Sequence, residues 1–153
     1  MMKTAKISNG VKNYETLEHP ADLKIKILGE SKEELFKNAF MSLTEALKPE
    51  KEKGGIEKER VIEIRSTDLP NLLVDFLSEI LYLSQVKKEV YKDIKFRKFP
   101  GDSKDLQKLE IKADLIGQRV RSFGEDIKAV TYHDLEVRQE SDGSFEATVL
   151  FDV

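Results

Sequence analysis

Residues 127–153 read IKAVTYHDLEVRQESDGSFEATVLFDV, and this stretch decides the fold. Apolar and polar residues alternate on both sides of a short polar segment, which predicts two strands. A three-residue loop over 141–143 would place Gly143 at the left-handed position that such loops require. The sequence therefore predicts an antiparallel hairpin at the end of the chain.

The parity of the hairpin predicts which side chains share a face. A loop of three residues pairs odd-numbered positions with odd-numbered positions, and both apolar sets are odd-numbered. Asp152 is then expected opposite Tyr132, on the polar face that also carries Asp134. The same register places His133 on an apolar face, unless a bulge shifts it. That face would also carry Ile127, Ala129, Thr131, Leu135 and Val137.

Two helices are expected upstream of the hairpin. Ser31 and Glu34 form a capping-box pattern before an amphipathic stretch that Pro49 ends. Asp68 followed by Pro70 marks the start of the second helix, which is apolar on most of its circumference and is therefore expected in the centre of the fold.

Short runs of period two predict the remaining strands, and residues 49–59 are interpreted as a charged surface loop. The expected fold class is α+β, with two helices packed on a mixed, mostly antiparallel sheet of about six strands. The runs upstream of the hairpin cover residues 23–28, 61–66, 90–96 and 109–115.

The composition is typical of one globular domain over residues 1–153, with residues 1–13 expected as a flexible extension. There is no cysteine, which excludes thiolate metal sites and favours the cytoplasm. No apolar run suggests a membrane span. The net charge of -3 argues against a broad nucleic-acid surface, and the basic run Lys95, Arg97 and Lys98 is interpreted as a solvated strand face.

Candidate chemistry is confined to two short segments, since the chain has no phosphate-binding glycine loop, catalytic triad order or zinc signature. The first segment is HPAD, which contains His19 and Asp22, and the second is TYHDL together with the closing FDV. Carboxylates from both chain ends would suit a hard cation such as calcium or magnesium. Short acidic clusters are also common as solvated surface residues.

Three motifs resemble those of the archease family. His19-Pro20-Ala21-Asp22 is similar to HTAD before a strand, LLVDFLSEILYL is similar to LLVDWLNELLYL, and KAVTYHDLEV with the closing FDV is similar to KAVTYHxLxV with its terminal FDI or FDV. The similarity runs from Tyr14 to Val153 in matching order. Residues 117–126 lack the Arg-His pair that is usual near the centre of this segment, and we assign no role to them.

The resemblance implies a protein cofactor without catalytic activity of its own. Its partner would be an RtcB-type RNA ligase, which acts in tRNA splicing and RNA repair. The protein would promote guanylylation of this ligase and its multiple turnover, and it could broaden the ligase's choice of nucleotide. Contact with tRNA would be indirect, and no membrane partner is implied. The implied metal ligands are Asp22, Asp152 and the carboxylate of Val153, with calcium expected and magnesium or manganese as alternatives. His19, Tyr132 and His133 would support them.

Two other functions stay open at the level of the sequence. In a metal-dependent phosphoesterase, the carboxylates would hold magnesium and His19 or His133 would transfer protons. In a chaperone-like binding module, the exposed face of the sheet would bind client proteins without a metal.

Overall fold

The computed structural model describes residues 4–5, 13–19, 22–101 and 108–153 of the chain. These residues form two helices and nine strands, and every strand pair is antiparallel. The predicted α+β class is confirmed. There are more strands than the expected six, and they divide between two sheets. The sequence did not indicate the additional strands because they are short or lie in charged segments, where the alternation of apolar and polar residues is weak.

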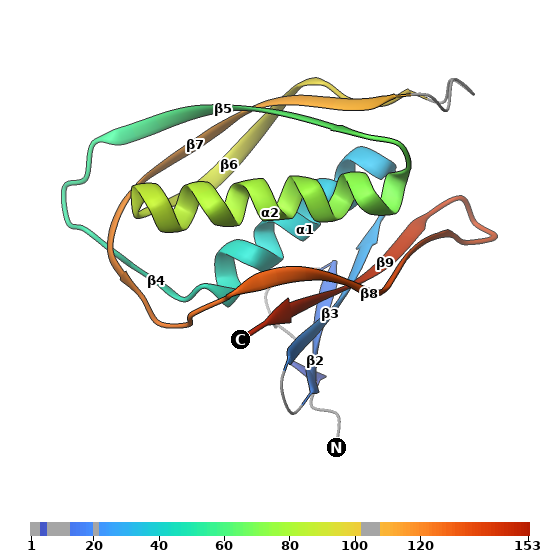
Figure 1. Ribbon diagram of the computed structural model, residues 1–153, viewed down its shortest axis with the longest axis horizontal. Coiled ribbons are helices and arrows are strands. Elements are labelled where there is room, and N and C mark those ends of the chain that lie inside the picture. The colour runs from blue at the N-terminus through green and yellow to red at the C-terminus, as the bar shows by residue number, and fades with distance from the viewer. Residues whose placement is uncertain (1–3, 6–12, 20–21, 102–107) are drawn as a thin grey trace.

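The first sheet joins the two chain ends. Its strand order is β1-β2-β3-β9-β8, so β3 and β9, far apart in sequence, are neighbours (Figure 1). The prediction that residues 1–13 are flexible falls mostly outside the described residues, although β1 pairs with β2. The strands are β1 (Thr4–Ala5), β2 (Tyr14–His19), β3 (Asp22–Gly29), β8 (Ala129–Gln139) and β9 (Phe145–Asp152).

The second sheet is organised around its long strand β7 (Leu109–Phe123). This strand pairs with β4 (Pro49–Lys51), β5 (Glu57–Ser66) and β6 (Glu89–Lys98). The interpretation of residues 49–59 as a loop is therefore wrong at both ends, where β4 and the start of β5 pair with β7. Pairing with β7 stabilises these charged strands without an apolar alternation of their own.

One glycine marks the closest approach between strands of the second sheet. Gly117 in β7 lies opposite Tyr91 of β6, and a Cβ atom at this position would lie 1.9 Å from the carbonyl oxygen of Val90. The register between the two strands shifts directly beside this point, between Tyr91 and Asp93. Glycine is therefore required here because the neighbouring backbone occupies the space of a side chain.

The two helices lie between the sheets (Figure 1). Helix α1 (Lys32–Ala46) packs against β3 and β6, and α2 (Leu69–Lys87) packs against β5 and β8. Ser31 and Asp68 cap them as predicted, since their side chains accept hydrogen bonds from the backbone N–H groups of Glu34 and Asn71. Both helices therefore begin where the sequence predicts.

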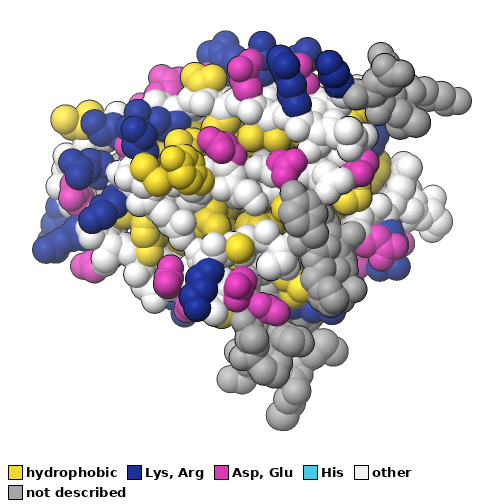
Figure 2. All heavy atoms as spheres, in the orientation of Figure 1, with side chains coloured by type: hydrophobic (Ala, Val, Ile, Leu, Met, Phe, Trp, Pro, Cys, Tyr) yellow, Lys and Arg dark blue, Asp and Glu magenta, His cyan; other side chains and the backbone are white. Residues whose placement is uncertain are grey.

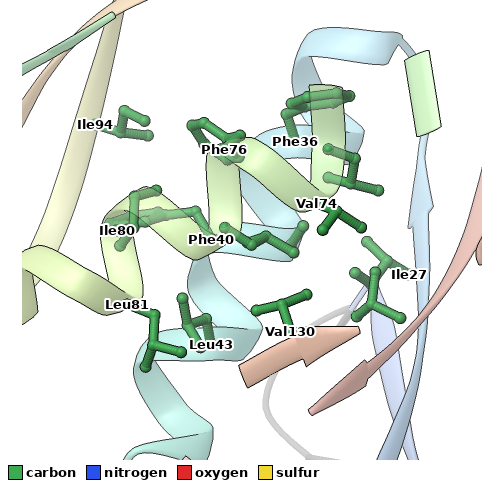
Figure 3. Packing of buried hydrophobic residues seen from close by; sticks show 14 of the residues in the cluster. Ile27, Phe36, Phe40, Leu43, Val74, Phe76, Ile80, Leu81, Ile94 and Val130 are labelled. Atoms are coloured by element: carbon green, nitrogen blue, oxygen red, sulfur yellow. The ribbon is translucent and has the colours of Figure 1, made fainter. Parts of the chain in front are cut away.

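A single core fills the space around the helices (Figure 3). Helix α2 is buried along most of its length, which confirms its predicted central position. Side chains from both sheets meet the helices there, and those labelled in the figure are Ile27, Phe36, Phe40, Leu43, Val74, Phe76, Ile80, Leu81, Ile94 and Val130. Within the described residues, neither helix combines the length and apolarity needed to cross a membrane.

The terminal hairpin has the predicted loop but a different register at its far end. Residues 141–143 form the turn, with Gly143 at φ 92°, and Val137 pairs with Ala147 as expected. Between Thr131 and Glu136 the register shifts, so that four residues of β8 lie opposite one residue of β9. The expectation that Asp152 lies opposite Tyr132 is therefore wrong.

The shift also changes which residues of β8 face the core. Asp152 pairs with Ala129, and Val130, which is 6% exposed, takes the buried position opposite Phe151. The expectation that Ala129 and Thr131 face the core is wrong for the same reason, because an odd number of extra residues reverses the parity of a strand. The side chains of residues 132–135 lie outside the described part of the chain, so the predicted orientation of His133 stays a prediction.

Candidate functional site

Asp22 and Asp152 lie directly opposite each other on the neighbouring strands β3 and β9. Their chain neighbours Leu23 and Phe151 pack on the core, and Phe151 is completely buried. Since successive side chains point to opposite faces of a sheet, both carboxylates are on the face turned away from the helices. The structure thus brings together the two acidic residues selected from the sequence.

The row of paired residues continues on both sides of the two aspartates. His19 of β2 pairs with Asp22, and Ala129 of β8 pairs with Asp152. The backbone N–H of Lys128 donates a hydrogen bond of 2.7 Å to the carbonyl oxygen of Asp152. Hydrogen-bonded backbone on both flanks therefore fixes the position of the pair.

The supporting residues predicted from the sequence are placed only by their backbone. His19 is the last residue of β2, and two residues separate it from Asp22 at the start of β3. Tyr132 and His133 lie within the bulge of β8. The side chains of all three lie outside the described residues. Their predicted roles stay predictions.

The chemistry of the donors suits a hard cation. Paired residues on adjacent antiparallel strands have Cβ atoms about 5 Å apart, and like charges in that arrangement repel each other. A divalent cation between them would turn this repulsion into attraction, and oxygen donors are what calcium and magnesium prefer. Val153 packs its side chain against the core, which holds the last main-chain carboxylate next to Asp152.

The donor set is small. Among the described residues, no group of three or more His, Cys, Asp or Glu side chains could hold a metal ion. A cation at this place would depend on two side-chain carboxylates, Asp22 and Asp152, completed by main-chain oxygens such as the carboxylate of Val153. Such a set would leave coordination positions for water or for groups of a second molecule.

Ion pairs lie on the same outer face, at its other end. The ammonium of Lys26 on β3 lies 3.3 Å from the carboxylate of Glu146 on β9, and the guanidinium of Arg138 on β8 lies 3.7 Å from the same carboxylate. The three strands thus carry cross-strand ion pairs near the hairpin and the two aspartates at the opposite end of β9. The two aspartates therefore lie at the end of β9 opposite to these ion pairs.

Buried acids elsewhere have arginine partners and are structural. Arg60 makes two hydrogen bonds of 2.9 and 2.8 Å to Glu89, which is 1% exposed, and they hold the pKa of Glu89 below its usual value. Tyr91 donates a further hydrogen bond to Glu89, and burial raises the pKa of this tyrosine. Arg97 pairs with the buried Asp114 in the same sheet. These groups join strands of the second sheet.

Sequence reasoning missed a cavity of about 610 Å³ at the end of β7. Residues 120–123 of β7 and 125–128 of the connection to β8 line it, together with the C-terminal ends of both helices. No local sequence pattern indicates it, because its lining comes from segments that are far apart in the chain.

Comparisons with known proteins agree with the fold. The model of the archease protein family matches residues 14–153. A protein archease from Methanosarcina barkeri is 37% identical over 153 residues, which cover 96% of this chain and all of that protein. One from Pyrococcus furiosus is 30% identical over 145 residues, which cover 94% of this chain and all of that protein.

Two solved structures share the architecture. The solution structure of a Methanobacterium thermoautotrophicum protein superimposes with a TM-score of 0.72 at 30% identity, covering 94% of this chain and all of that one. The crystal structure of a Thermotoga maritima archease, described as a possible chaperone, has a TM-score of 0.58 at 24% identity, with 97% and 99% coverage. The family match over residues 14–153 and these full-length relatives show that the chain belongs to the archease family.

Proposed function

We propose that this chain is a metal-binding protein cofactor that activates an RtcB-type RNA ligase in tRNA splicing and RNA repair. In this role it promotes guanylylation of the ligase and multiple turnover, broadens its nucleotide choice, and is not itself an enzyme. The observation that carries the proposal is the direct pairing of Asp22 with Asp152 in a chain that belongs to the archease family.

In the proposed site, Asp22, Asp152 and the carboxylate of Val153 hold one divalent cation. Calcium is the expected ion, and magnesium or manganese would be held by the same oxygens. The cation supplies positive charge that attracts phosphate oxygens. The paired strands β3 and β9 hold the two side chains in fixed positions, so the site does not need to reorganise when it meets a partner.

The proposed contact with the ligase is made by the outer face of the first sheet. Asp22 and Asp152 are partly exposed, and they lie on the face that the helices do not cover. The acidic, metal-bearing end of this outer face could thus reach into the nucleotide-binding cleft of a partner. The tRNA would then be contacted through the ligase.

The test measures covalent guanylate formation on the cognate ligase, with GTP and a divalent metal, with and without this protein. Asp22→Asn and Asp152→Asn are expected to abolish the stimulation while leaving the fold intact. Asp142→Asn is the matched control, because it removes a carboxylate from the hairpin loop of the same sheet. Full stimulation by both folded site variants would refute the proposal.

A second experiment tests the main-chain carboxylate. One additional glycine after Val153 moves the terminal carboxylate away from Asp152 without changing any side chain. Weaker stimulation at low calcium, recovered at high calcium, is expected. Unchanged calcium dependence would remove Val153 from the ligand set.

The same preparation distinguishes the alternatives. Chelator-sensitive turnover of a phosphoester by the purified protein alone would favour a metal-dependent phosphoesterase. The Thermotoga maritima structure is described as a possible chaperone. If the wild-type and Asp152→Asn proteins suppressed the aggregation of a client protein equally well, a chaperone-like function would be favoured for this chain.

A further inference from the structure

The cavity at the end of β7 is built from an apolar floor and a charged rim. Leu47, Val120 and Ile127 are almost completely buried and form the floor together with Phe123, which is half-buried. The volume of about 610 Å³ is within the range of cavities that bind small molecules. Phe123 is the residue among these four that leaves appreciable surface for a ligand to contact.

Three cations surround this floor. Lys88, Arg121 and Lys128 are among the residues that line the cavity; all three are exposed, and none of them makes an ion pair within the described part of the chain. Elsewhere on the surface, cations such as Lys26 and Arg97 are paired with carboxylates. Figure 2 shows Lys and Arg side chains gathered at the left, at the end of the molecule where α2 ends.

The wall of the cavity is held in place by hydrogen bonds. The backbone N–H groups of Gly124 and Glu125 donate to the carbonyl oxygens of Lys48 and Leu47, at 2.7 and 3.2 Å. The side-chain amide of Gln85 on α2 donates to the carbonyl oxygen of Ile127 at 2.6 Å. The segment between β7 and β8 is thus fixed to both helices, and the cavity is formed before any ligand arrives.

We propose that this cavity binds a nucleotide, with the base on the apolar floor and the phosphates between Lys88, Arg121 and Lys128. Glu125 and Asp126 also line the cavity, and their carboxylates can accept hydrogen bonds from the amino groups of a base or from ribose hydroxyls. Arginine and lysine are the side chains that bind phosphate oxygens most strongly.

The mixed charge of the rim favours a mononucleotide over an RNA strand. A continuous phosphate backbone needs a basic track, and here two carboxylates interrupt the three cations. A nucleotide has its phosphates at one end only, so cations and carboxylates can serve opposite ends of the same ligand.

The cavity adjoins the aspartate pair through one residue. Lys128 lines the cavity, and its backbone N–H donates to the carbonyl oxygen of Asp152. The nucleotide proposal does not require the ligase activation proposed above, because binding is measured on this protein alone. Failure of one proposal therefore leaves the other intact.

The experiment titrates GTP, ATP and inorganic phosphate separately into the purified full chain by isothermal calorimetry. Both nucleotides are expected to bind, and phosphate alone at least tenfold more weakly. Lys88→Glu and Arg121→Glu should each weaken nucleotide binding by roughly tenfold or more, because a charge-assisted hydrogen bond is replaced by repulsion. Lys37→Glu is the control, since Lys37 is exposed on α1 and carries the same charge change away from the cavity.

Three results would overturn the proposal. The first is no nucleotide binding to the wild-type protein, and the second is binding that the two rim variants leave unchanged. The third is tight binding of a short RNA oligonucleotide in the absence of mononucleotide binding, which would indicate an RNA surface instead. Circular dichroism spectra should be recorded to check that both rim variants are folded. We expect them to fold because Lys88 and Arg121 are exposed.

Discussion

At the scale of single residues, the Asp22–Asp152 pair is held by the backbone, whereas Glu89 is held by its side-chain partners. Asp22 and Asp152 face each other because the pairing of β3 with β9 places them opposite each other, and both carboxylates lie at the partly exposed outer face of the sheet. Glu89 is buried and receives hydrogen bonds from Arg60 and Tyr91. The first arrangement suits a binding site, and the second suits stability.

Glu89→Gln should lower the free energy of unfolding at neutral pH by about 3 kcal/mol, because it breaks a buried ion pair. The folded-state pKa of Glu89 lies below its unfolded value of about 4.3, so its contribution is present above that pH and is lost as the pH falls through the folded pKa. Denaturant unfolding of both proteins between about pH 7 and pH 3 should show the difference shrinking toward acid.

The control for this prediction is Glu57→Gln. Glu57 pairs with Lys92 at 3.4 Å, but both side chains are more than half exposed. Its removal should change the free energy of unfolding by less than about 1 kcal/mol at any pH, as expected for a surface pair. A Glu57 effect as large as that of Glu89 would contradict the assignment of burial as the cause.

Asp152→Asn should have opposite effects with and without metal. In chelator, removal of one of two facing carboxylates should raise the free energy of unfolding by a few tenths of a kcal/mol, because like charges no longer oppose each other. In calcium, the wild-type melting temperature should rise while that of the variant stays constant. Differential scanning calorimetry measures both, and equal calcium shifts in the two proteins would exclude Asp152 as a ligand.

At the scale of elements, the close contact between β6 and β7 depends on Gly117. Gly117→Ala should lower the free energy of unfolding by about 1–3 kcal/mol, because the new methyl group overlaps the carbonyl oxygen of Val90 and the strands must separate. Gly55→Ala is the matched control, since its Cβ would meet only ordinary contacts of 3.5 Å or more. Urea unfolding of the two variants provides the comparison.

The elements also show which features a sequence determines locally. Both helices and their capping residues Ser31 and Asp68 were predicted, because caps and amphipathic periods depend on residues within a few positions. The bulge in β8 was not predictable, since TYHDLEV alternates through it without a glycine or proline to mark it. Its position depends on the pairing with β9.

Part of the candidate site could also be predicted from the sequence. Asp22 and Asp152 were selected because they stand at strand ends near the two ends of the chain, and the resemblance to the archease family named them as ligands. That they are direct partners depends on the register of β3 and β9, which the sequence did not indicate. The cavity at the end of β7 could not be predicted. It depends on how the C-terminal ends of α1 and α2 meet the segment after Phe123, which no local pattern encodes.

At the scale of the whole molecule, the two sheets share one core through the helices. Leu77 is completely buried in the centre of α2. Leu77→Ala should lower the free energy of unfolding by about 2–5 kcal/mol, and it should do so for both sheets together because no separate core would remain. Amide hydrogen exchange measured by NMR should show the same loss of protection in β3 and in β7.

The comparison variant is Tyr82→Ala, on the same helix but 56% exposed. It should change the free energy of unfolding by less than about 0.5 kcal/mol. Loss of protection confined to one sheet in Leu77→Ala would indicate that the two sheets unfold independently.

The hairpin loop has a practical consequence for work on this protein. Phe145 and Asp152 stand at opposite ends of β9, about 24 Å apart along an extended strand. Asp152 is positioned by β3, so residues inserted at the exposed loop 141–143 leave the aspartate pair unaltered. An affinity tag or fluorescent label inserted in that loop is therefore expected to leave the proposed metal ligands at the other end of β9 in place.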